Sequence, residues 1–181
     1  MTVYFVSSNK HKHADVARIF KNSANPPRIL DRPLVEILSS DLEKVVKEKA
    51  KAAYKATLVP LFVEHGALYI DYLNGFPGPM VKLFWEKLDQ LLPTLIPEGA
   101  PRSARVIQMV CYCDEKQLHV YSGQVDGHIA SEKRGSDGIH WDSMFIPAGH
   151  TRTMGEMSAD ERIAAHAFSR AYAAMRKEHG L

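Results

Sequence analysis

The sequence predicts an α/β protein built around a mixed β-sheet. Helical and strand patterns alternate through the first half of the chain, and a strand hairpin follows them. The chain has 181 residues, of which 45% are hydrophobic and 24% charged, and this suits one globular domain with its own core. We therefore expect a single domain over residues 1–181.

The first half of the chain begins with Val3 to Ser7, a short β-rich apolar run. A polar turn follows it, and then apolar residues fall at helical spacing to Phe20. A second strand is predicted over residues 29–37, although Pro33 weakens it. The capping-box pattern Ser40-x-x-Glu43 precedes a Lys/Ala-rich helix that reaches residue 56. Two further strands are predicted over residues 58–63 and 68–72.

In the second half, Pro79 can start a helix whose apolar stripe includes Trp85. Strands over residues 105–113 and 118–125 are joined by a four-residue polar turn, 114–117, and a short strand is expected over 128–130. Residues 131–157 are Gly-rich and irregular. A second capping box, Ser158-x-x-Glu161, opens a terminal helix that runs to Gly180.

Composition limits the classes of function. The 23 basic and 21 acidic residues are spread along the chain and leave a formal charge of +2, so we expect neither a nucleic-acid nor a membrane partner. Cys111 and Cys113, two apart on a strand, are about 7 Å from each other and are expected to be small core residues without a disulfide. With no signal-like or membrane-spanning apolar segment, we expect a soluble, cytoplasmic protein.

Two segments suit phosphate groups. Ser7-Ser8-Asn9-Lys10-His11-Lys12 lies between a strand and a helix start, where free N–H groups and the helix dipole favour anions. The alternative is that Ser8 or Asn9 only caps the helix and the lysines are solvated. Gly75-Phe76-Pro77-Gly78-Pro79 suits either a triphosphate or a tight connection. Glu64 places a carboxylate at the end of a strand, next to His65.

The segment from Arg134 to Asp142 combines a cation, glycines, an aromatic plane and a carboxylate within nine residues. A base would stack on Trp141, or Trp141 would anchor a long surface loop in the core. His166 on the terminal helix has two interpretations, a site residue or a partly buried structural histidine.

Taken together, these blocks resemble the inosine triphosphate pyrophosphatase family, which hydrolyses non-canonical purine nucleoside triphosphates such as ITP, dITP and XTP to monophosphates and pyrophosphate. The resemblance covers almost the whole chain and is carried by SSNKHK, KAKAAY, VEHGALYIDYLNGFPGPMVKLF, SGQVDGHIA and RGSDGIHWDSMFIPAGHTRTMGEM, in that order.

The resemblance implies two lobes around an elongated mixed sheet with a central cleft, a homodimer and a magnesium cofactor. It implies that Ser8, Asn9 and Lys12 hold the triphosphate and that Glu64 binds metal and takes part in catalysis. Trp141 and Asp142 would line the base pocket, with Arg162 and His166 as further substrate contacts. Thr153 and Glu156 would brace the loop beneath that pocket.

The sequence departs from the family where the chemistry is expected. The family's paired acids are Glu64-His65 here; an imidazole titrates near neutrality and suits a general base, but it is a poor magnesium ligand. Lys44 aligns with a metal-binding glutamate of the family, and Glu43, one residue away, is the candidate to replace that ligand.

The base-reading positions have also changed. Ile139 and His140 replace an aromatic residue and a glycine, and Ser143 replaces a proline. Arg162 replaces a lysine, and His166-Ala167-Phe168 replaces Ser-His-Arg, so that Arg170 is the remaining candidate for the missing arginine.

Two hypotheses follow. In the first, the protein is a nucleoside triphosphate pyrophosphatase in which water attacks the α-phosphorus, with Lys12 and a metal on Glu64 stabilising the charge and His65 as the candidate base. In the second, it is a nucleotide-binding paralogue that keeps the cleft but has lost metal-binding acids and turnover. His65 and Lys44 motivate the second hypothesis.

Overall fold

The computed structural model describes residues 2–115 and 117–181. Its strands are β1 (Tyr4–Ser7), β2 (Arg28–Asp31), β3 (Leu61–Ile70), β4 (Phe76–Gly78), β5 (Ser103–Cys113), β6 (Leu118–Ile129) and β7 (Phe145–Pro147). Its helices are α1 (Lys10–Ile19), α2 (Leu42–Thr57), α3 (Val81–Leu88), α4 (Ala159–Ala165) and α5 (Ala167–His179), with 3-10 turns η1 (Asp71–Leu73), η2 (Asp89–Leu95), η3 (His140–Ser143) and η4 (Met154–Glu156).

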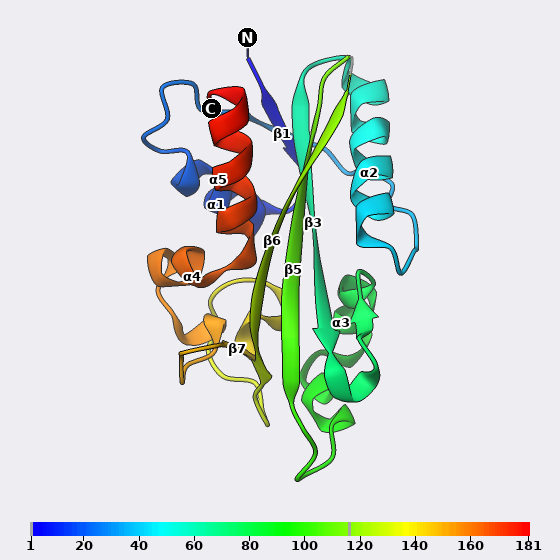
Figure 1. Cartoon of the computed structure of the whole chain (residues 1–181), viewed down its shortest axis with the longest axis vertical. Helices are drawn as coiled ribbons and strands as arrows, with labels where there is room; N and C mark the ends of the chain where they lie inside the picture. The colour runs from blue at the N-terminus through cyan, green and yellow to red at the C-terminus, as the bar shows by residue number, and fades with distance from the viewer. Residues whose placement is uncertain (1, 116) are drawn as a thin grey trace. The chain divides into compact units, whose positions relative to one another are not determined.

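The strands form one mixed sheet in the order β2-β1-β3-β5-β6-β7, and β4 also pairs with β3. This confirms the predicted α/β class. The chain divides into two compact units (Figure 1). Unit 1 comprises residues 1–65, 108–123 and 168–181, and unit 2 comprises residues 66–107 and 124–167.

In unit 1, β1 is parallel to both β2 and β3. Alternate side chains of a strand point to opposite faces of the sheet. In unit 1, both faces carry buried apolar side chains. Helix α2 covers one face (Figure 1), where Val46 and Ala50 pack with Val6 and Val63. The two cysteines lie in the same core as free, buried thiols, as predicted.

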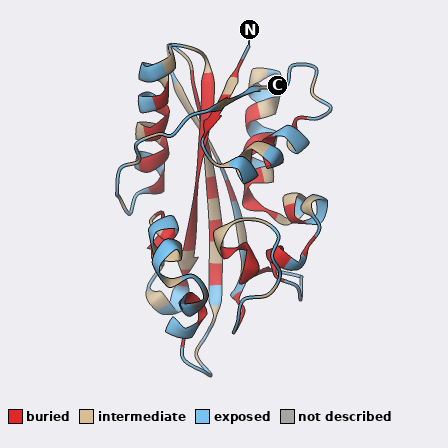
Figure 2. Cartoon of the chain, turned by 180° about the vertical axis from the view of Figure 1, so that it is seen from behind, coloured by how far each residue is buried: buried red, intermediate tan, exposed pale blue. Residues whose placement is uncertain are grey.

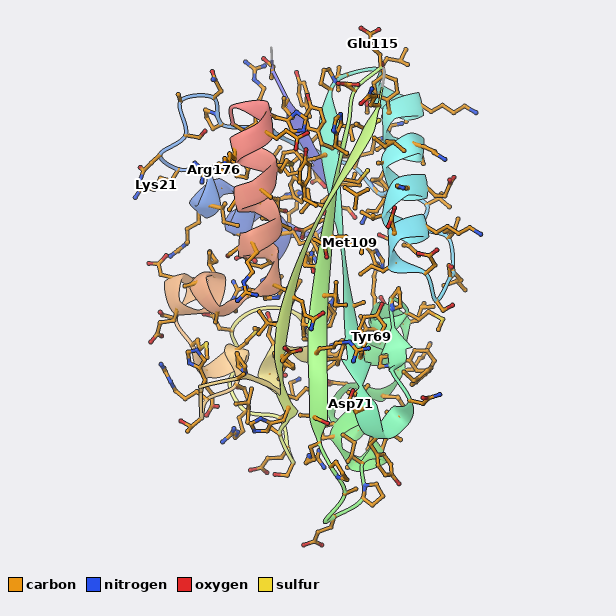
Figure 3. All side chains as sticks on the ribbon, viewed as in Figure 1. Lys21, Tyr69, Asp71, Met109, Glu115 and Arg176 are labelled. Carbon is orange, nitrogen blue, oxygen red and sulfur yellow. The ribbon has the colours of Figure 1, made fainter. Side chains whose placement is uncertain are left out.

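On the other face of unit 1, Phe62 stacks on Phe5 and on Phe20, with ring centroids 5.1 and 6.0 Å apart. Tyr172 of α5 meets Phe62 and Phe20 edge to face. Arg176, labelled on α5 in Figure 3, holds its guanidinium 5.1 Å from the centre of the Phe20 ring. These aromatic contacts attach α5 to the strands.

In unit 2, β4 is antiparallel to β3 and β7 is antiparallel to β6. Its core is a second apolar cluster that includes Leu68, Val106, Ile129, Phe145 and Met154. Figure 2 shows buried residues along the strands and on the helix surfaces that face them. Among the described residues, no helix combines the length and the apolar character needed to cross a membrane.

Several predicted boundaries were wrong because tertiary pairing overrides local pattern. The strands predicted over residues 58–63 and 68–72 are one strand, β3, which pairs with β1 at its start and with β4 at its end. Likewise β6 joins the strands predicted over 118–125 and 128–130. Strand β2 ends at Asp31, before Pro33. The hairpin between β5 and β6 is confirmed, but Lys116 of its turn lies outside the described residues.

Helix boundaries also differ from the prediction. The N-cap of α2 is Asp41, whose carboxylate accepts from the Lys44 N–H at 3.0 Å, in place of Ser40. The Ser158–Glu161 capping box is confirmed. The prediction of a single terminal helix is wrong, because the backbone at His166 is extended (φ −80°, ψ 147°) and separates α4 from α5.

Candidate active site

Glu64 of β3 is a buried carboxylate surrounded by hydrogen-bonding and cationic groups of unit 1. Its side chain is 5% exposed, and the Lys12 Nζ lies 3.2 Å from its Oε1. The Tyr172 hydroxyl donates to its Oε2. The Lys49 Nζ donates to its backbone carbonyl at 3.0 Å. Burial opposes ionisation of Glu64, but the Lys12 charge and the Tyr172 hydrogen bond outweigh it, and the pKa is lowered.

Glu36 extends this group of charges. Its Oε1 accepts from the Lys49 Nζ at 2.7 Å, and its Oε2 lies 3.7 Å from the His65 Nδ1. Burial raises the pKa of Glu36, but the charge and hydrogen bond of Lys49 outweigh burial and lower the pKa to about 2. We call Lys12, Glu36, Lys49, Glu64, His65 and Tyr172 the Glu64 cluster. Both of its carboxylates are therefore held ionised.

Three members of the Glu64 cluster were missed by the sequence interpretation. Glu36 falls within the strand predicted over residues 29–37, but it lies in the irregular segment after β2. Lys49 is one of several lysines on α2, but it is buried. Tyr172 looked like one residue of an apolar helical stripe. Their roles depend on contacts between segments distant in sequence; the nearest signal was the appearance of Lys49 in the block KAKAAY.

The predicted phosphate-binding residues lie at the start of α1. Asn9 is the N-cap, and its side-chain oxygen accepts from the N–H groups of His11 and Lys12 at 2.9 and 3.3 Å. Ser8 is exposed beside it. The structure thus brings Lys12 to Glu64 and orients the first turn of α1. Capping and phosphate binding remain compatible at this helix start.

Glu43 and Lys44 occupy exposed positions on α2. The Glu43 carboxylate pairs with Lys47 one turn along the helix, with 53% of the Glu43 side chain exposed. The acid that shares Lys49 with Glu64 is Glu36, not Glu43. The position of Glu43 therefore does not favour its predicted role as a metal ligand.

Asp142 is the centre of a second buried group, in unit 2. Its Oδ2 accepts from the Ile139 N–H at 2.8 Å and lies 3.8 Å from the Arg162 Nη1. The His166 Nε2 lies 3.8 Å from its Oδ1. The structure thus brings together three residues predicted to bind substrate, from η3, α4 and the α4–α5 junction. We call Asp142, Arg162 and His166 the Asp142 cluster.

The segment before Asp142 is shaped by close packing. A side chain at Gly138, where φ is +81°, would begin 2.1 Å from the Asp142 Oδ2, so only glycine fits. His140 also has a positive φ, 49°, at the position where the family has glycine. Trp141 is buried in the core of unit 2, which agrees with the alternative in which it anchors the loop.

Thr153 and Glu156 brace the same loop, as expected. The Thr153 hydroxyl donates to the Arg134 carbonyl at 2.7 Å, and the Glu156 Oε2 accepts from the Thr153 N–H at 2.8 Å. The Arg134 Nε lies 3.6 Å from the Glu156 Oε2. These contacts connect residue 134 to η4.

The chain is thus a mixed α/β protein whose buried, ionised Glu64 lies against the ammonium groups of Lys12 and Lys49. The model of the Ham1 family matches residues 3–178, and the chain belongs to that family.

Similar proteins agree with this assignment. The chain is 35% identical over 171 residues to the "Inosine triphosphate pyrophosphatase" of Schizosaccharomyces pombe, covering 89% of this chain and 86% of that protein. It is 32% identical over 163 residues to the "dITP/XTP pyrophosphatase" of Thermococcus kodakarensis, covering 90% and 88%. The fold matches a HAM1 protein from Coxiella burnetii with a TM-score of 0.77, at 21% identity and 98% coverage of both chains.

Proposed function

We propose that this protein is a nucleoside triphosphate pyrophosphatase that hydrolyses non-canonical purine nucleotides such as ITP, dITP and XTP to the monophosphate and pyrophosphate. The names of its curated relatives support this activity. The observation that carries the proposal is the Glu64 cluster, in which two ionised carboxylates, two lysines and an imidazole lie together. This set supplies both charge stabilisation and a candidate base.

The basic groups of the Glu64 cluster would bind the triphosphate. Lys12 is at the start of α1, and Lys49 is buried between Glu36 and the Glu64 carbonyl. Together with Asn9, Ser8 and the positive end of the α1 dipole, they favour an anion. In the reaction, Lys12 would stabilise the negative charge that develops on the phosphate oxygens.

The donor set fits magnesium. Glu64 and Glu36 offer carboxylate oxygens, which this ion prefers, and both are held ionised. Each carboxylate is balanced here by an ammonium group, Lys12 on Glu64 and Lys49 on Glu36. We propose Glu64 and Glu36 as the ligands, in place of Glu43. When bound, magnesium would neutralise charge on the phosphate oxygens.

His65 is proposed as the general base. It follows Glu64 on β3, and the Glu36 carboxylate near its Nδ1 would orient the imidazole and stabilise its protonated form. His65 would take a proton from the water that attacks the α-phosphorus. The arrangement replaces the second acid of the family by a base that does not bind magnesium.

The Asp142 cluster is proposed to recognise the purine base. Asp142 is a buried acceptor, and Arg162 and His166 are buried donors beside it. Trp141 would hold Asp142 in place from within the core. Recognition by buried polar groups discriminates strongly, because the wrong base leaves such groups unpaired.

The test is pyrophosphate release from ITP, dITP, XTP, ATP and GTP, with magnesium or manganese. We expect release from the first three and much less from ATP and GTP. Glu64→Gln should lower kcat on the order of a hundredfold or more, because it removes a proposed ligand of the metal that would neutralise the phosphate charge. Glu48→Gln, on the surface of α2 and paired with Lys51, is the matched control. No release from any nucleotide with either ion would overturn the proposal.

The metal assignment has its own comparison. Glu36→Gln should raise the magnesium concentration needed for half-maximal activity, because it removes a ligand. If Glu43→Gln has that effect and Glu36→Gln does not, the ligand is Glu43. The homodimer implied by the family resemblance also remains a proposal, which sedimentation of the purified chain checks.

A further inference from the structure

A group of side chains of the types that ligate metal ions lies in unit 1, and none of its members belongs to the Glu64 cluster. His119, Glu178 and His179 each offer a ligand atom, and these three atoms lie within 4.8 Å of one another. The set contains two imidazole nitrogens and one carboxylate oxygen. It is the one such group found among the described residues.

The fold explains why these residues meet. His119 is the second residue of β6, and Glu178 and His179 form the last turn of α5. Consecutive side chains of a helix point about 100° apart. Glu178 and His179 can therefore both contact His119 only because β6 lies against this end of α5. The His119 Nδ1 lies 3.2 Å from the Glu178 Oε1, which places two of the donors in direct contact.

Neighbouring aromatic residues orient the third donor. The Tyr112 ring of β5 stacks on the His179 ring at 3.8 Å between centroids and 18° between planes. Tyr121 is two residues after His119 and so lies on the same face of β6, and its hydroxyl lies 2.8 Å from the His179 Nε2. The stacked Tyr112 ring and the Tyr121 hydroxyl together hold the His179 ring in one orientation.

We propose that His119, Glu178 and His179 form a binding site for a divalent transition metal of the zinc class. Two nitrogens and one carboxylate oxygen suit zinc, cobalt or nickel, whereas magnesium prefers oxygen donors alone. Zinc binds each ligand atom at roughly 2 Å, which places two ligand atoms about 3.3 Å apart in a tetrahedral site. Donors that lie up to 4.8 Å apart therefore need to approach one another by only about 1–1.5 Å. Three protein ligands leave a coordination position for water.

The site is accessible to an ion, and His119 and Glu178 are not part of the buried core. The side chains of His119 and Glu178 are 28% and 53% exposed. A bound ion would join β6 to the end of α5, the helix that also carries Tyr172. Binding should therefore stabilise the folded chain against unfolding.

The experiment uses the full chain without an added histidine tag. Calorimetric titration with zinc chloride should give one molar equivalent of binding, and cobalt chloride should give the visible absorption of a nitrogen- and oxygen-ligated ion. Zinc should raise the thermal midpoint, and magnesium at the same concentration should not produce the same rise through this site. Absence of stoichiometric zinc and cobalt binding would overturn the proposal.

Variants locate the ion. His119→Ala and His179→Ala should abolish the cobalt spectrum, and Glu178→Gln, which keeps the shape of an exposed side chain, should weaken zinc binding at least about tenfold. His150→Ala is the matched control for an exposed histidine elsewhere. Unchanged binding in Glu178→Gln and both alanine variants, or binding lost in Cys113→Ala instead, would refute the assignment.

Discussion

His65 is the residue that most separates this chain from the pattern of its family. It stands beside the buried Glu64, where the family resemblance leads us to expect a second acid, and its Nδ1 lies 3.7 Å from the Glu36 Oε2. A carboxylate and an imidazole both accept protons, but they do so in different pH ranges. We therefore expect the proposed base to change how activity depends on pH.

The first prediction concerns this base. His65→Ala should lower kcat by about 10²- to 10⁴-fold, the usual contribution of a general base. His65→Asp should keep much of the activity and move the acidic limb of the kcat/KM profile about two pH units lower, because an aspartate ordinarily titrates well below an imidazole. The measurement is pyrophosphate release across about pH 4 to 9, a range that includes the ordinary pKa values of aspartate and histidine. An identical acidic limb in the wild type and His65→Asp would contradict this role.

The control for that series is His128→Ala, an exposed histidine on β6. Its profile should coincide with that of the wild type. Each variant needs the same folded fraction at each pH, which circular dichroism establishes.

The second prediction concerns Glu36 and acid stability. Its pKa is about 2 in the folded protein against an ordinary 4.5, because Lys49 outweighs burial. The unfolded chain therefore takes up this proton first as pH falls, and the stability contributed by the ionised form is present above pH 4.5 and lost toward pH 2. Roughly 2 kcal/mol should be lost by about pH 3.

Urea unfolding at pH 6 and at pH 3 measures this difference. The free energy of unfolding should fall between those values by roughly 2 kcal/mol more in the wild type than in Glu36→Gln. Glu48→Gln should show the same fall as the wild type. Equal falls in the wild type and Glu36→Gln would show that the ion pair with Lys49 does not carry this stability.

At the scale of elements, Arg102, the residue before β5, joins that strand to two other segments of unit 2, residues 93–96 and 129–130. Its guanidinium donates to the backbone carbonyls of Pro93, Ile96, Ile129 and Ala130 at 2.7 to 3.2 Å. Pro93 lies in η2 and Ile96 follows it, whereas Ile129 ends β6 and Ala130 follows it. One side chain thus donates to four backbone acceptors.

The third prediction tests this clamp. Arg102→Leu should lower the free energy of unfolding by about 3 kcal/mol, because several charge-assisted hydrogen bonds are lost together. Arg105→Leu is the matched control: Arg105 lies 5.1 Å above the Tyr69 ring and 3.5 Å from Asp71, but its side chain is 42% exposed, so its loss should cost under about 1 kcal/mol. Tyr69 and Asp71 are labelled in Figure 3. Equal costs in urea unfolding would argue against the clamp.

At the scale of the whole molecule, β3, β5 and β6 each supply residues to both compact units. Each unit also has its own buried cluster, with Val46 in unit 1 and Val106 in unit 2. Each of these three strands is one continuous segment that runs through both units. We expect the units to unfold together.

The fourth prediction uses the two tryptophans, Trp85 and Trp141, which both lie in unit 2. Val46→Ala, in unit 1, should lower the urea midpoint of tryptophan fluorescence and of circular dichroism equally, with a cost of about 1.5 kcal/mol. Val106→Ala, in unit 2, is the matched substitution and should do the same. A fluorescence midpoint that is unchanged by Val46→Ala would mean that the units unfold separately.

The sequence predicted much of this fold and part of the candidate site. The strand–turn–helix at residues 3–20 and the hairpin of β5 and β6 are visible locally, because alternation and turn residues mark them. Asn9 and Lys12 were identified as candidates because they lie at the start of a helix that follows a strand. Glu64 was identified because a strand was predicted to end beside it, although it lies inside β3. Glu36 and Lys49 were not, because nothing in their neighbourhoods distinguishes them from surface charges.

The sequence by itself determined the α/β class, the membership of the chain in its family and the positions of the main phosphate-side candidates. Only the tertiary structure decided that β3 is one strand, that the last helix is divided at His166 and that Glu36, not Glu43, shares Lys49 with Glu64. The physical reason is that strand and helix periodicity is a local property. The burial and pairing of a charge depend on residues that are distant in sequence, as Lys12, Glu64 and Tyr172 are from one another.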